Sequence, residues 1–109
     1  MTKESALAAW RGDAPPDDLP AADRLPFLML RATYHAYRAG AISQAEGEHI
    51  KRFLDRYPAC TPSEQRTLLQ YAFAHLSARA GQGDMAALAD SRELARAHYE
   101  LTGAGPSGA

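Results

Sequence analysis

The chain has 109 residues, of which 46% are hydrophobic and 23% are charged, and its formal net charge is −1 at pH 7. This length suits one small domain with a single core and excludes two. The near-zero charge provides no field that would draw the protein onto nucleic acid or an anionic membrane. There is no apolar run of about 18 residues and no basic segment ahead of an apolar one, so we expect neither a membrane span nor a secretory signal.

Valine is absent, and proline and glycine cluster between segments of helical periodicity, so the sequence predicts an all-α protein. We expect a compact bundle of four main helices plus a short N-terminal helix, with mostly antiparallel neighbours because the loops are short. This single domain covers residues 1–102, and the tail at 103–109 is expected to be disordered. Cys60 is the one cysteine, which excludes an internal disulfide and favours a cytoplasmic location.

The first predicted element is a short helix from Thr2 to Trp10, with Thr2 as its N-cap and Gly12 as its end. Leu7 and Trp10 share one face of it. So short a helix is marginal alone, and we expect Trp10 to anchor it to the bundle. The acidic, proline-rich segment at 13–20 is interpreted as a stiff surface connector, with an extended partner-binding motif as the alternative.

The chain is organised around an apolar helix predicted from Pro26 to Ala39, with Pro26 in its first turn. Apolar residues cover two of its sides, and a narrow sector between them carries Arg31, His35 and Arg38. A helix that is apolar over most of its circumference must be covered by several neighbours. We therefore expect it to be the central helix of the bundle.

Gly40 ends this helix, and a second one is predicted from Ser43 to about Tyr57. Ser43 and Glu46 form a capping box at its start. Gly47 lies on its inner face, where glycine costs roughly 1 kcal/mol relative to alanine, so we infer that the two helices approach closely there. The polar outer face carries Gln44, Glu48, Lys51, Arg52, Asp55 and Arg56.

A second capping box, Thr61 with Glu64, opens a helix that is predicted to run to about Ala80. Its buried stripe consists of Leu68, Leu69, Ala72, Phe73 and Leu76. Its opposite face is weakly polar and carries Thr67, Tyr71, Ala74 and Ala78. Asp84 caps the last helix, which ends near Thr102. Three tyrosines are expected to lie in the core with a wet hydroxyl, namely Tyr34, Tyr37 and Tyr99.

The segment Gly40-Ala-Ile42-Ser43-Gln-Ala-Glu46, followed by Lys51 and Phe53-Leu54, resembles the helix-turn-helix of SHOCT-type short bacterial domains. Those domains read G-x-I-T/S-x-x-E and then K-x-x-L/I-L, with an aromatic residue at the position of Gly47. With Tyr34 to Gly40 in front, the segment is also similar to small helical proteins of bacterial prophages and mobile elements. The resemblance implies an accessory protein that binds a host protein, as some anti-CRISPR proteins do when they block nucleases.

Glu46 and His49 have the Glu-x-x-His spacing of di-iron bundles, but the sequence lacks the second copy that such a site needs. We therefore interpret Glu46 as a cap and expect neither a metal nor another cofactor. Cys60 has no histidine beside it in sequence, and no phosphate-binding loop or dinucleotide motif is present. We expect the protein not to be an enzyme.

Protein binding is the favoured function, because the chain has five tyrosines and more arginine than lysine, residue types that interfaces favour. The alternative is a small DNA-binding regulator that uses the helix-turn-helix at 26–57, although much charge on its second helix is paired along that helix. The partner is expected to be a host protein in the bacterial cytoplasm, with a homodimer as a further option. The candidate binding residues are Arg31, His35, Arg38, Arg52, Arg56 and, in a flat patch, Tyr71.

Overall fold

A computed structural model describes residues 2–103, and this part of the chain contains five α-helices, one 3₁₀-helix and no strand. The elements are α1 (Lys3–Ala9), α2 (Ala21–Arg38), α3 (Gln44–Asp55), η1 (Tyr57–Ala59), α4 (Pro62–Gly81) and α5 (Met85–Thr102). The predicted all-α bundle of four main helices plus a short N-terminal one is confirmed. The predicted tail falls, beyond Gly103, on positions that lie outside the described residues.

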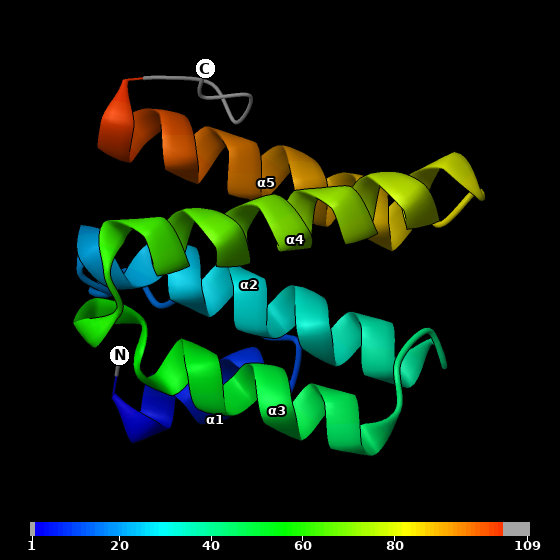
Figure 1. The fold of residues 1–109 in the computed structure, drawn as a ribbon, viewed down its shortest axis with the longest axis horizontal. Coiled ribbons are helices and arrows are strands. Elements are labelled where there is room, and N and C mark those ends of the chain that lie inside the picture. Colours follow the sequence, from blue (N-terminus) through cyan, green and yellow to red (C-terminus); the bar gives the residue numbers. More distant parts are fainter. Residues whose placement is uncertain (1, 104–109) are drawn as a thin grey trace.

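α2 lies at the centre of the bundle and packs against α1, α3, α4 and α5. Successive helices from α2 to α5 run in alternating directions (Figure 1). α4 and α5 also pack on each other, whereas α3 and α4 make little or no direct contact. The predicted central position of α2 is confirmed, and α3 and α4 cover different sides of it.

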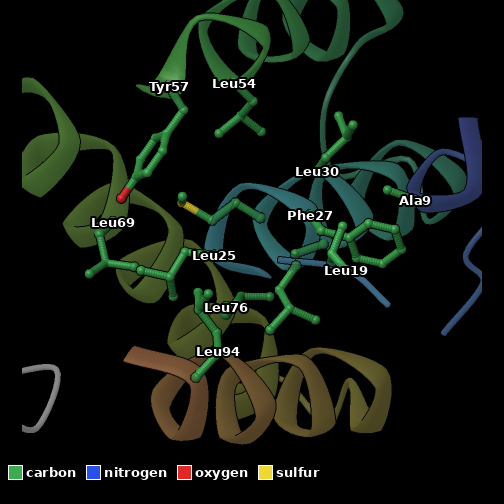
Figure 2. Close-up of a cluster of buried hydrophobic side chains, with 14 of the residues drawn as sticks. Ala9, Leu19, Leu25, Phe27, Leu30, Leu54, Tyr57, Leu69, Leu76 and Leu94 are labelled. Carbon is green, nitrogen blue, oxygen red and sulfur yellow. The ribbon is translucent and has the colours of Figure 1, made fainter. Parts of the chain in front are cut away.

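One hydrophobic cluster joins all the described helices. Burying each large apolar side chain in such a cluster contributes about 1.5–3 kcal/mol. Figure 2 shows side chains from α2, α3, α4 and α5 gathered in this cluster, and among the fully buried ones are Phe27, Leu30, Leu54, Leu76 and Leu94. The proline-rich connector also takes part, since its Leu19 is only 8% exposed.

α2 begins at Ala21 rather than at Pro26, so the predicted start of the central helix was wrong. Pro26 stands inside the helix and has no N–H to donate to the carbonyl of Ala22. Ala22 is exposed, and water can satisfy its carbonyl in this first turn. Pro26 itself is less than 2% exposed, so packing in the core offsets the lost helical hydrogen bond.

Local capping interactions fix the helix ends where the sequence predicts them. The amide of Glu46 donates to Ser43 Oγ at 3.1 Å, and the amide of Ser43 donates to the Glu46 carboxylate at 3.4 Å. Thr61 and Glu64 form the same reciprocal pair at 2.9 and 3.2 Å. Gly40 adopts a φ of +75° at the end of α2, a conformation that glycine accepts without strain.

Trp10 anchors α1 to both α2 and α3. Its ring lies 5.7 Å from the ring of Tyr34 and stacks at 6.1 Å on the ring of Tyr37. The Lys51 ammonium of α3 lies 5.3 Å from the centre of the indole, in a cation–π contact. A Cβ atom at Gly47 would lie 3.3 Å from Trp10. The close approach at Gly47 is therefore present, but its partner is Trp10 and not α2.

Tyr99 and Leu7 are among the large apolar side chains that lie on the surface. Tyr99 is 60% exposed, and Leu7 is 49% exposed on α1. The expected burial of Tyr99 was wrong because α5 turns a different face to the bundle, which buries Ala87, Leu94 and Ala97 together with one acidic residue. Small alanines on this face allow α5 to pack closely on α2 and α4.

Replacing Gly47 by leucine should destabilise the protein by about 2 kcal/mol and lower its melting temperature by roughly 10 °C, because the new side chain must displace Trp10. Thermal melting followed by tryptophan fluorescence measures both effects. Gly81→Leu is the matched control, since a Cβ at this helical glycine meets nothing within 4 Å. Equal melting temperatures for the two variants would show that Trp10 does not restrict position 47.

Candidate functional site

A partly buried network of polar and charged side chains connects α2 to α5. Asp90 of α5 is 6% exposed and accepts a hydrogen bond of 2.7 Å from Nδ1 of His35. The Arg31 guanidinium lies 3.7 Å from the other oxygen of Asp90 and also pairs with Glu93, one turn further along α5. The same guanidinium donates to the backbone carbonyl of Asp13 at 3.4 Å, which fastens the connector to α2. This network holds three segments together.

The network changes the interpretation of the sector of α2 that carries Arg31, His35 and Arg38. Arg31 is only 8% exposed, and its charge is met by acidic side chains of the same chain. The side chain of His35 is 28% exposed, and its Nε2 would lie 3.4 Å from a Cβ at Gly12, so the turn at Gly12 covers it in part. Acidic side chains of α5 supply the partners of Arg31 within the fold. Arg31 is therefore unavailable for partner contacts. Among the three residues of this sector, Arg38 is the exposed one.

The two candidate arginines of α3 lie on the surface. Arg52 is exposed, and Arg56 is exposed at the C-cap, where its guanidinium lies 5.3 Å from the centre of the Phe53 ring. The six candidate residues thus do not form one surface. Arg31 and His35 converge on Asp90. Arg38 lies at the end of α2, Arg52 and Arg56 lie one turn apart at the C-terminal end of α3, and Tyr71 lies on α4.

Tyr71 stands at the edge of an apolar groove between α3 and α4. The floor of the groove is formed by buried residues of α2, among them Met29, Ala32 and Ala36, which are at most 6% exposed. We call this feature the α3–α4 groove; its lining is Met29, Ala32, Thr33, Ala36, Ile42, Ile50, Leu54, Leu68, Tyr71, Ala72, His75, Leu76 and Arg79. An open depression continues from it over Ala45, Glu46 and His49 of α3.

The size of the groove limits what can occupy it. Its volume is about 40 Å³, enough for a few water molecules at most. Sites for small molecules and cofactors commonly enclose about 300–1,000 Å³. The groove is therefore suited to single side chains of a larger molecule that lies across it.

Arg79 is the charged residue in the lining of the groove. It is 7% exposed, and its Nη2 donates to the carboxylate of Asp84 at 2.6 Å. The other terminal nitrogen, Nη1, is buried and has no hydrogen-bond partner within residues 2–103. The backbone amide of Ala87, and then Arg79, hold the pKa of Asp84 below its ordinary value of 3.8. The Asp84 carboxylate thus both caps α5 and orients Arg79.

The described residues contain no cluster of three or more histidine, cysteine, aspartate or glutamate side chains that could hold a metal ion. Cys60 is a free, half-buried thiol. No helix within 2–103 has both the length and the apolar character that crossing a bilayer requires.

Several residues of these features were not found from the sequence. Asp90 and Glu93 are spaced for one face of α5, but nothing local links them to Arg31, which is 62 positions from Glu93. Arg79 precedes Asp84 by five positions across a helix end, a local signal that could have predicted their pairing. The groove depends on how far apart α3 and α4 lie, which no local pattern encodes.

No protein-family model matches the chain, and neither a curated protein nor a solved structure matches it at the significance required.

Replacing Asp90 by alanine should reduce the free energy of unfolding by about 3 kcal/mol, because it leaves Arg31 buried without one of its two acidic partners. Urea unfolding measures this change. Asp13→Ala is the control, since its carboxylate pairs with Arg11 on the surface and its loss should cost less than about 0.5 kcal/mol. Equal effects of the two substitutions would contradict the structural role of the network.

Acid should weaken the protein in part through Asp84. Because the folded pKa of this carboxyl lies below its ordinary value, its contribution to stability is complete above that value and is lost as the pH falls through the folded pKa. Asp84→Asn should therefore lower the urea midpoint at about pH 6.5 and lower it less at about pH 2.5. Asp55→Asn, an exposed substitution on α3, should change neither midpoint. If Asp84→Asn lowered the urea midpoint equally at both pH values, this role of the Asp84 carboxylate would be contradicted.

Proposed function

We infer that the protein is a non-catalytic protein-binding module that covers a surface of another protein with the α3–α4 groove and its rim. The observation that carries this proposal is Tyr71, which is 50% exposed beside an apolar groove. Tyrosine contributes a large apolar area and a hydrogen-bonding hydroxyl at small entropic cost, and it is common among residues that dominate binding energy. Burial of Tyr71 against a partner would remove this exposed apolar surface from water.

The biological setting is proposed from the resemblance at Gly40 to Glu46. It supports an accessory protein of a phage or mobile element, acting in the cytoplasm of a bacterial host. Its most specific form is an inhibitor of a host defence nuclease, as anti-CRISPR proteins are. A module that acts by occlusion needs no reaction centre, which agrees with a groove too small for a substrate of ordinary size.

DNA binding is less well supported as the alternative. A helix-turn-helix reader exposes basic side chains to phosphates and presents one helix to a groove of the duplex. In this chain α2 is enclosed by four helices, and Arg31 is neutralised within the fold. Arg38, Arg52 and Arg56 remain exposed, but the buried Arg31 does not extend their surface.

Tyr71→Ala should reduce the amount of partner captured from bacterial lysate about tenfold, since truncating a central interface tyrosine commonly costs more than 1 kcal/mol. The measurement is quantitative mass spectrometry of proteins retained by the tagged chain, with wild type as reference. Tyr99→Ala is the matched control, because Tyr99 is 60% exposed on α5, away from the groove. Retention that is unchanged by Tyr71→Ala, or reduced equally by both substitutions, would overturn the proposed surface.

A further inference from the structure

Tyr71 also lines the open depression that continues from the α3–α4 groove. The rest of the lining comes from one stretch of α3, which carries Glu46 and His49 together with Ala45 and Ile50. The depression has a volume of about 440 Å³, but it is open to solvent and encloses too little of a small molecule to hold it alone. A protein surface that lies over Tyr71 would close the depression.

Glu46 gives this depression a negative charge that the fold does not neutralise. Its side chain is exposed, and it takes part in no ion pair within residues 2–103. One carboxylate oxygen, Oε1, accepts the capping bond from the amide of Ser43, which is long at 3.4 Å. No lysine or arginine is among the residues that line the depression. The carboxylate of Glu46 is therefore available to a positive group from outside.

This carboxylate restricts which partners can bury Tyr71. A surface that covers Tyr71 also covers Glu46, because both residues line the same depression. Removing a carboxylate from water without a positive partner is strongly unfavourable. An apolar or acidic surface would therefore bind poorly here, whereas a cationic side chain makes the same carboxylate a favourable contact.

The exposed ring of Tyr71 distinguishes between the two basic side chains. Half of this residue is accessible to solvent. A guanidinium is planar and stacks on an aromatic ring while its N–H groups donate to a carboxylate, whereas an ammonium is a strongly hydrated point charge. Ile50 and Ala45 offer apolar surface on which the methylene groups of a long side chain can pack. The lining therefore suits arginine better than lysine.

Resting on the function proposed above, we propose that the partner protein inserts an arginine side chain into the depression between Tyr71 and Glu46. The guanidinium stacks on the ring of Tyr71 and pairs with the Glu46 carboxylate, and the methylene groups of the arginine pack on Ile50. This assigns a chemistry to the partner, because the surface that meets Tyr71 carries an exposed arginine and is not acidic.

The test selects cyclic peptides from a display library for binding to the wild-type protein and removes those that still bind Tyr71→Ala. The remaining peptides should be enriched in arginine. Glu46→Gln should bind them about tenfold more weakly, because the charge is lost while glutamine, like glutamate, completes a capping box. Added salt should weaken binding to the wild-type protein more than binding to Glu46→Gln.

Glu64→Gln is the matched control, because Glu64 holds the same position in the capping box of α4 and lies outside the lining of the depression. This variant should bind the selected peptides as the wild-type protein does, and thermal melting verifies that both glutamine variants are folded. The ion pair itself is measured by replacing the arginine of a selected peptide by citrulline, which keeps the shape and removes the charge. The replacement should weaken binding to the wild-type protein about tenfold and binding to Glu46→Gln much less.

Three results would overturn this inference. They are a selection in which no peptide depends on Tyr71, enrichment of lysine or apolar residues in place of arginine, and equal effects of Glu46→Gln and Glu64→Gln on peptide affinity. The proposed function can survive each of them. If capture from lysate is lost with Tyr71→Ala but unchanged with Glu46→Gln, the binding surface stands and the arginine is rejected.

Discussion

The fold depends on covering α2. Its side chains are apolar over most of the helix circumference, so a single neighbour cannot remove them from water, and four helices pack against it. Arg31 lies within this buried surface, and a buried guanidinium requires acidic partners. α5 provides Asp90 and Glu93 for this purpose. Burial of α2 thus determines where α5 lies and why the central core contains an ionic network.

The groove follows from the same requirement. α3 and α4 each cover one side of α2, and the short η1 element joins them without bringing them into close contact. Between them lies the shallow α3–α4 groove, whose floor on α2 is buried and whose edge carries Tyr71, which is 50% exposed. Another protein that covers the groove would bury Tyr71. The binding proposal therefore rests on Tyr71 and the groove beside it.

Sequence reasoning succeeded where the signal is local. The boxes begun by Ser43 and Thr61 each lie within four residues, and the all-α class follows from periodicity and composition. It failed where distant segments meet. Gly47 indicated a close contact, but only the fold identifies Trp10 as the neighbour. The partners of Arg31 are about 60 positions away on another helix, and the groove is a spacing between helices that no sequence pattern records.

Hydrogen exchange of the protein alone and in complex with its captured partner tests the central claim most directly. If the partner covers the α3–α4 groove and Tyr71, amides in the bordering segments 45–54 and 68–79 should gain protection, while those of α5 should exchange as before. Protection gained over 85–102, with the two bordering segments unchanged, would contradict the account and would place the functional surface on α5.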